Sequence, residues 1–203
     1  MPESFESTAR KTASVRDALT AAFTRPYFLS LLADERRFAL DMGKPFCICL
    51  IDIDQLRKFN EQAGVSSGDR LLADVAEAVR GALDLPQWQT LRALMGRYDG
   101  DSFMLLMPGC RLDRAENFAH VIRRRISRVD HDAVCITASM AIAAFKGDDS
   151  IDELLTRAEK TLYLAKQFGG DRIEVSRTAE LTRDLASVTR LPVAFKDHRA
   201  KSA

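Results

Sequence analysis

Apolar and polar positions along the chain follow two patterns, which predict a mixture of helices and strands. Continuous or alternating apolar runs are typical of strands, and they predict strands at residues 46–51, 91–97, 103–107, 134–145 and 172–175. Apolar residues spaced by three and four predict helices at 26–42, 55–62, 68–83, from 113 onward and after 150. The order is α-β-α-α-β-β-α-β-α-β, and its hairpins exclude a purely parallel sheet.

Turn and capping residues set the limits of these elements. Thr24 and Pro26 suit the start of the first helix, and Gly43 suits its end. The inward positions of that helix are predicted to be Phe28, Leu31, Leu32, Phe38 and Met42. Asp113 with Glu116 resembles a capping box. Residues 1–16 are polar and aperiodic, which predicts a flexible arm, and residues 176–203 predict a tail that is partly helical or disordered.

Composition narrows the class of protein. The 203 residues are 46% hydrophobic and 29% charged, as in an ordinary globular protein, with a net charge of +1. A net charge this close to zero gives no overall electrostatic attraction to nucleic acid or to an acidic membrane, so we expect no nucleic-acid partner. No segment approaches the roughly 20 apolar residues that span a bilayer, and no signal peptide is visible. We therefore expect a cytoplasmic protein without membrane insertion.

The cysteines and histidines argue against a site built on sulfur and nitrogen. Four cysteines are present, none in a C-x-x-C pair, and they fit small buried side chains in a reducing compartment: Cys47, Cys49, Cys110 and Cys135. The three histidines have no ligand spacing. A metal would therefore need oxygen ligands.

Two strand ends carry carboxylates that could provide those oxygens. Asp52 ends the first apolar strand, and Asp101 follows Gly100 in the predicted turn between the second and third strands. We expect Asp52 and Asp101 to meet across adjacent strands as ligands of Mg²⁺, which would itself bind a phosphate. The backbone N–H groups of the helix that begins at Gln55 suit the same phosphate. The alternative is that both aspartates only cap turns.

A second pair of polar residues flanks the loop of residues 63–68. A carboxylate such as Asp69 can accept hydrogen bonds from two guanine N–H groups, and an amide such as Asn60 can donate and accept. The pair can therefore read guanine. The alternative is that Asn60 ends one helix and Asp69 caps the next.

These features occur in order with others, and together they resemble one family. The motifs are Asp17-Ala18-Leu19-Thr20 with Arg25-Pro26-Tyr27-Phe28, Asp52-Ile53-Asp54, Asn60-Glu61, Gly64, Gly68-Asp69, Arg97-Tyr98-Asp99-Gly100-Asp101-Ser102-Phe103, residues 137–143, and Tyr163-x-Ala165-Lys166. From residue 17 to residue 175 the chain resembles the GGDEF family, the diguanylate cyclases of bacterial cyclic di-GMP signalling. The resemblance implies one domain over 17–175. Its fold would be α/β, with a mixed, largely antiparallel central sheet flanked by helices, as in nucleotidyl cyclases and polymerase palms.

The resemblance also implies a chemistry and a site. Active members condense two GTP into cyclic di-GMP, each subunit of a homodimer presenting one GTP, with Mg²⁺. By resemblance, Asp52 and Asp101 are catalytic and hold the metal with the Ile53 carbonyl, and Asn60 and Asp69 bind guanine. The phosphates would be bound by Lys166 and by the backbone N–H groups of Gln55, Leu56 and Arg57, and Gly100 would let the backbone approach the nucleotide.

The sequence departs from the family pattern at positions that matter. The first glycine of G-G-[DE]-E-F is Asp99, whose charge would repel a triphosphate, and the fourth-position glutamate is Ser102, a poor base at neutral pH. Gly170 stands where the family commonly has a phosphate-contacting arginine. The R-x-x-D motif of product inhibition is absent, because its positions hold Thr90 and Ala93.

Three functions fit this combination. The first is a degenerate GGDEF domain with impaired catalysis that binds GTP with Mg²⁺ or a cyclic dinucleotide, or a protein partner, as a regulatory module. This hypothesis fits a site that keeps the residues that bind the substrate but has lost the residue that would stabilise the transition state. The second is a slow but active diguanylate cyclase. The third is a scaffold that binds no nucleotide.

Overall fold

The computed structural model describes residues 15–131, 134–147 and 149–177, so most of the predicted arm and nearly all of the predicted tail lie outside the described residues. The elements follow one another as α1 (Arg25–Met42), β1 (Phe46–Ile53), α2 (Leu56–Ala63), α3 (Val65–Leu83), the 3₁₀ turn η1 (Gln89–Leu91), β2 (Leu94–Asp99), β3 (Ser102–Pro108), α4 (Leu112–Ile126), β4 (Asp130–His131), β5 (Val134–Cys135), β6 (Ala138–Ala144), α5 (Ile151–Gln167) and β7 (Ile173–Val175).

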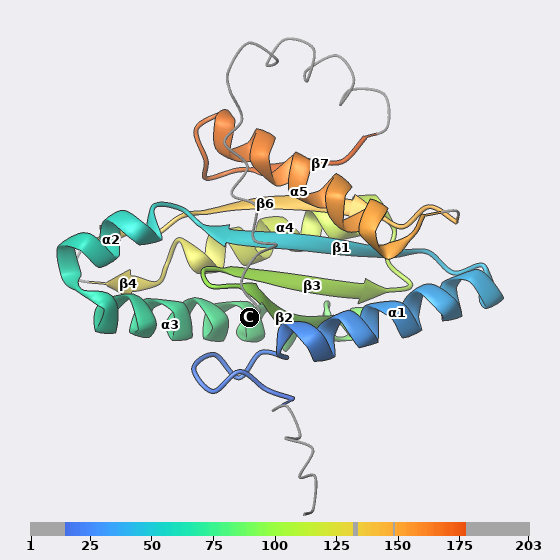
Figure 1. The fold of residues 1–203 in the computed structure, drawn as a ribbon, viewed down its shortest axis with the longest axis horizontal. Helices are drawn as coiled ribbons and strands as arrows, with labels where there is room; N and C mark the ends of the chain where they lie inside the picture. Colours follow the sequence, from blue (N-terminus) through green and yellow to red (C-terminus); the bar gives the residue numbers. More distant parts are fainter. Residues whose placement is uncertain (1–14, 132–133, 148, 178–203) are drawn as a thin grey trace, which may run out of the picture.

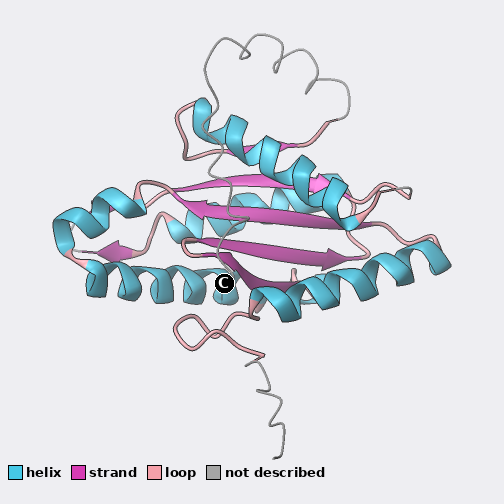
Figure 2. Ribbon diagram, in the orientation of Figure 1, coloured by secondary structure: helices cyan, strands magenta, loops and turns pink. Residues whose placement is uncertain are grey.

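The central sheet has the order β2-β3-β1-β6-β7. Every neighbouring pair is antiparallel except β6–β7, which is parallel. The predicted mixed, largely antiparallel sheet is therefore confirmed. A separate two-stranded pair, β4–β5, lies beside it (Figures 1 and 2).

Helices cover both faces of the sheet. In Figure 1, α1 and α5 lie in front of the strands and α4 lies behind them. α2 lies at the left, and α3 packs with α4 on the second face of the sheet. Side chains on the two faces of β1 belong to two different cores. Cys47, Cys49 and Ile51 lie in the core under α3 and α4. Ile48 and Leu50 lie in the core under α1 and α5. A strand buried on both faces has no polar side, which explains its continuous apolar sequence.

The edge of the sheet at β2 is covered by the chain that precedes α1. The N–H of Phe23 donates to the Met95 carbonyl at 2.9 Å, and the N–H of Arg97 donates to the Phe23 carbonyl at 2.8 Å. Phe23 therefore forms a one-residue parallel bridge beside Gly96. Gly96 is needed there because a Cβ at this position would lie 2.4 Å from the Phe28 ring.

Three predicted elements differ in the structure. Phe38 and Met42 are 49% and 59% exposed, because the last turns of α1 pack less against the sheet than the apolar spacing predicted. β2 begins at Leu94, three residues late, because residues 89–91 form the 3₁₀ turn and Arg92 has a positive φ of 46°. The single strand predicted at 134–145 is divided, because residues 134–135 pair with β4 and β6 begins at Ala138.

The predicted capping box is wrong, and another exists. α4 has Arg111 as its N-cap, so Asp113 lies inside the first turn. The capping box belongs to α5, where the Glu153 N–H donates to Ser150 Oγ at 3.2 Å and the Ser150 N–H donates to Glu153 Oε2 at 2.7 Å. None of the helices within the described ranges has the length and apolar character that a bilayer crossing requires.

Candidate functional site

The end of β1 and the β2–β3 turn meet at one side of the sheet. Asp52 is paired in register with Ser102, and the Ile53 N–H donates to the Asp101 carbonyl at 3.5 Å. Asp52 and Asp101 line one cavity of about 280 Å³, which also receives Lys166 from α5. The structure therefore places the two predicted carboxylates and the predicted lysine together.

Lys166 forms an ion pair with Asp52 inside this cavity. The Asp52 side chain is 16% exposed and that of Lys166 is 39% exposed. Burial raises the pKa of Asp52 to about 6; the Lys166 ammonium lowers it, and the charges of Asp101 and Asp54 add to the rise. Burial therefore disfavours the ionised form of the Asp52 carboxyl.

We expect Asp52→Asn to stabilise the fold at neutral pH. The unfolded carboxyl titrates near 3.8 and the folded one near 6, so the folded state binds more protons between these values and its stability falls as the pH rises through them. Asparagine removes this loss. Chemical denaturation should show a higher free energy of unfolding for Asp52→Asn at pH 7.5 and little gain at pH 3.5. An equal gain at both pH values would contradict the assigned pKa.

Asp54 is a site residue that sequence reasoning did not assign. Its carboxylate accepts hydrogen bonds from Thr137 Oγ1 at 2.8 Å, Ser139 Oγ at 2.7 Å and the Asp171 N–H at 2.9 Å. It therefore ties β1 to β6 and to the segment between α5 and β7. The sequence pattern could have indicated this role, because Thr137 and Ser139 place two hydroxyl side chains on one face of an otherwise apolar strand.

The β2–β3 turn is held from both sides. Arg97 donates to the Gly100 carbonyl at 2.6 Å and to Asp17 Oδ1 at 3.0 Å. The register shifts between Arg97 and Asp99, so Tyr98 stands in a bulge, and its hydroxyl donates to Glu159 Oε1 at 2.5 Å. These bonds fix the turn relative to the segment before α1 and relative to α5.

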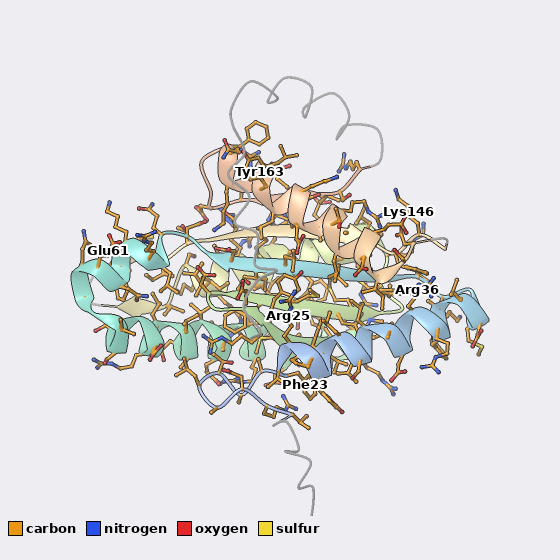
Figure 3. All side chains as sticks on the ribbon, viewed as in Figure 1. Phe23, Arg25, Arg36, Glu61, Lys146 and Tyr163 are labelled. Carbon is orange, nitrogen blue, oxygen red and sulfur yellow. The ribbon has the colours of Figure 1, made fainter. Side chains whose placement is uncertain are left out.

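Arg25 and Tyr163 extend the surroundings of this site. The Arg25 guanidinium lies 4.8 Å from the centroid of the Tyr98 ring. Figure 3 labels Arg25 at the start of α1 and Tyr163 on α5, and Tyr163 also lines the cavity of Asp52. The cavity wall therefore combines aromatic rings with carboxylates.

Asp99 and Ser102, the two departures from the family motif, both line the cavity of Asp52. Ser102 is 7% exposed at the start of β3 and lines the cavity opposite Asp52. Asp99 is exposed, lines the same cavity, and accepts the Gly100 N–H at 2.8 Å through Oδ1. The lining therefore holds four carboxylates, Asp52, Asp99, Asp101 and Glu159, and among its described residues one cation, Lys166.

The predicted phosphate-binding backbone lies just beyond β1. Gln55 precedes α2 with a positive φ of 57°, and Leu56 and Arg57 form the first turn of that helix. First-turn N–H groups have no acceptor within their own helix. The Leu56 side chain is buried, and the exposed Arg57 side chain pairs with Glu61 at 3.1 Å.

The predicted guanine residues lie on two helices that pack together. Asn60 is on α2, and its Oδ1 is buried with no hydrogen-bond partner among the described residues. It lies against Gly68 of α3, where an added Cβ would be 1.7 Å from Oδ1. Asp69 follows in the first turns of α3 and is exposed. The Asp69 carboxylate is therefore accessible to a ligand, whereas Asn60 Oδ1 is buried against Gly68.

Gly170 stands where the family commonly has an arginine, and it is not among the residues that line the cavity of Asp52. Its φ is +74°, and an added Cβ would lie 3.1 Å from Asp54 Oδ1. The backbone here is fixed by the Asp171 N–H to Asp54, so a side chain at position 170 would be strained. The family arginine is thus absent, and the local backbone conformation suits glycine.

The donor set agrees with a hard cation. Within the described residues no cluster of three or more potential metal-ligating side chains is present. Mg²⁺ needs few protein ligands, because it retains water and takes oxygens from phosphates. Two carboxylates and a backbone carbonyl on adjacent strand ends fit that requirement.

Comparison with known proteins gives a consistent picture. The curated diguanylate cyclase DgcM of Escherichia coli is 30% identical over 162 residues, which are 79% of this chain and 38% of DgcM. DgcP of Pseudomonas aeruginosa is 28% identical over 138 residues, 66% of this chain and 20% of DgcP. The chain thus spans about two fifths or less of the length of these relatives.

Solved structures agree on the fold. Diguanylate cyclase SiaD of Pseudomonas aeruginosa, in complex with its activator SiaC, matches with a TM-score of 0.72 and 29% identity over 80% of this chain and 62% of SiaD. The GGDEF domain of DgcB from Caulobacter crescentus, in complex with c-di-GMP, matches with a TM-score of 0.73 and 24% identity over 80% of this chain and 96% of that domain, which supports the fold alone. The family model described as "Diguanylate cyclase, GGDEF domain" matches residues 14–172, and the chain therefore belongs to the GGDEF domain family.

Proposed function

We propose that this chain is a degenerate GGDEF domain that binds GTP with Mg²⁺, or a cyclic dinucleotide, and acts as a regulatory module with impaired cyclase chemistry. One observation carries the proposal. The cavity retains Asp52, Asp101 and Lys166, while the position of the family glutamate holds Ser102, a buried hydroxyl. Binding groups are kept and the acid–base group is lost.

The charge of the cavity makes binding depend on a cation. Four carboxylates and one ammonium line it, so a triphosphate alone would meet net repulsion. Mg²⁺ held by Asp52, Asp101 and the Ile53 carbonyl would supply the missing positive charge and polarise the phosphate. Lys166 would then move from Asp52 to a phosphate oxygen, which the exposure of its side chain allows.

A slow diguanylate cyclase is the second candidate. It is favoured by the placement of Asp52 and Asp101 in one cavity, because the metal ligands of the family site are among the residues retained here. Two GTP molecules would have to meet across a homodimer, since one cavity of this kind holds one nucleotide.

The experiment is a calorimetric titration of GTP into the protein with and without Mg²⁺. We expect binding with Mg²⁺, at least about 10-fold weaker binding without it, and a similar loss in Asp52→Ala, since charged contacts are typically worth about 1.5–3 kcal/mol. Asp69→Asn should reduce the preference for GTP over ATP and leave the Mg²⁺ dependence unchanged.

Three outcomes separate the candidates. GTP binding without product supports the regulatory module. Cyclic di-GMP produced at high protein concentration above the Asp52→Ala background would replace it with the slow cyclase. No heat and no thermal shift with GTP or cyclic di-GMP would leave only the scaffold.

A further inference from the structure

One side of α1 carries a row of apolar side chains that the described residues leave largely uncovered. Tyr27, Phe38 and Met42 are exposed, and Leu31 is only partly buried at the margin of the core under α1 and α5. Their spacing of four, seven and four residues keeps them on one face of the helix. We call this row the outer stripe. Contiguous exposed apolar groups on the surface of a domain mark sites of interaction.

The outer stripe faces away from α5. At one end of it, the Tyr27 ring packs on Phe23 with centroids 5.1 Å apart, at the edge of the sheet formed by β2. On the other side of α1, Arg36 donates to the Asp149 carbonyl at 2.8 Å, just before α5. Figure 3 shows this division, with Phe23 labelled below α1 and Arg36 above it. The outer stripe therefore lies along the margin of the domain, where a second molecule can approach.

The order of residues along the outer stripe is symmetric about a point between residues 34 and 35. Tyr27 and Met42 lie equally far from this point, and so do Leu31 and Phe38. Consider two antiparallel copies of α1 related by a twofold axis through that point. Tyr27 would then meet Met42 of the second copy, and Leu31 would meet its Phe38, with each contact made twice. A surface that matches itself in this way fits a second copy of the chain.

The centre of the outer stripe holds charges that also match themselves. Asp34 and Arg37 form an ion pair, and their side chains are 66% and 72% exposed. Beside a twofold axis, each Arg37 would lie within one helical turn of both Asp34 carboxylates, its own and that of the second copy. The two acids and two bases would therefore alternate around the axis. Complementary charges of this kind fix the register of an interface more than they add to its affinity.

We propose that the outer stripe is a dimerisation surface, on which two copies of α1 pack antiparallel about a twofold axis near residues 34 and 35. One pair of helices is small beside a standard interface of about 1,200–2,000 Å², so the dimer is weak and reversible. It differs from a dimer that would join two GTP molecules. Arg25, which lies over the Tyr98 ring of the Asp52 cavity, would be about 30 Å from its copy along the helix axis. The two cavities therefore stay apart.

The test is sedimentation velocity of the full chain over about 10–500 μM, a range suited to a weak interface. We expect a dimer fraction that rises with concentration. Phe38→Glu places a charge within the apolar contact and should weaken dimerisation at least about 10-fold. Leu40→Glu is the matched control, because Leu40 is exposed on the same helix but two positions from both Phe38 and Met42, on another side of it. Leu40→Glu should leave dimerisation unchanged.

An exchange of charges tests the register. Asp34→Arg alone would gather four arginines at the axis, and Arg37→Glu alone would gather four carboxylates, so each single variant should weaken the dimer. Asp34→Arg combined with Arg37→Glu brings opposite charges back together and should restore dimerisation. Restoration of this kind separates a broken contact from a damaged fold, because a second substitution at an exposed position would not repair misfolding.

Three results would overturn the proposal: a wild type that stays monomeric over the whole range, equal weakening by Leu40→Glu and Phe38→Glu, or no restoration in the variant with exchanged charges. GTP titration of the same variants should give the affinity of the wild type, because no residue of the outer stripe lines the Asp52 cavity. Absence of GTP binding would therefore count against the proposed function alone, and loss of dimerisation would count against this inference alone.

Discussion

Replacing Asp99 with glycine and Ser102 with glutamate together is expected to raise the rate of cyclic di-GMP formation by about 10²–10⁴-fold, the usual worth of general acid–base help. Ser102 lines the cavity opposite Asp52, so a glutamate there would enter the same cavity. Glycine at position 99 removes an exposed carboxylate from the lining. The rate is measured by product formation from GTP and Mg²⁺ at several protein concentrations.

The matched control is Asp99→Gly with Ser102→Gln, which has nearly the same shape and lacks the carboxylate. It should gain no more than Asp99→Gly alone, which removes the charge of Asp99 from the cavity. If the glutamate variant binds GTP and gains no rate, Ser102 is not what limits turnover, and the missing cation at Gly170 or the absence of a dimer becomes the explanation. A gain that rises with protein concentration would show that two subunits cooperate.

Asp149→Ala is expected to lower the free energy of unfolding by about 3–5 kcal/mol, as when one partner of a buried ion pair is removed. Asp149 accepts from both terminal nitrogens of Arg157, at 2.8 and 2.6 Å, and from the Lys146 N–H at 2.8 Å. The side chains are 9% and 14% exposed, so the arginine would be left buried without its partner. Urea denaturation measures the loss.

The control and the pH dependence test the cause. Asp152→Ala, at an exposed position in the first turn of α5, three residues after Asp149, should change stability by no more than about 0.5 kcal/mol. Burial raises the pKa of Asp149, but the hydrogen bonds from Arg157 and Lys146 outweigh it and hold that pKa below 3.8. The contribution is therefore complete above the unfolded value and is lost as the pH falls through the folded one. The deficit of Asp149→Ala should shrink in acid; a constant deficit would point to packing instead.

The parts of the fold that could be predicted are those that depend on residues close together in the sequence. The run at 46–51 has no polar position, which predicted a central strand, and β1 is that strand. The Asp99–Gly100 dipeptide between apolar runs predicted the hairpin, and the hairpin joins β2 to β3. The placement of Asp52 beside Asp101 followed from these two elements.

The parts that could not be predicted depend on contacts between distant residues. Thr137 and Ser139 read as the polar face of a strand, and their role appears only when β6 pairs with β1 and brings them to Asp54. Phe38 and Met42 continue the helical spacing of α1, but spacing does not show where the sheet stops.

The bridge between Phe23 and β2 has a practical consequence for shortening the chain. An uncovered sheet edge offers unpaired N–H and C=O groups to any other strand, and such edges promote aggregation. Fragments that begin at α1 would lose the two backbone bonds that Phe23 makes to Met95 and Arg97. They would also lose Asp17, the carboxylate that Arg97 holds. Expression fragments of this domain should therefore start before Asp17, because the residues ahead of the first helix keep β2 from pairing with a neighbouring molecule.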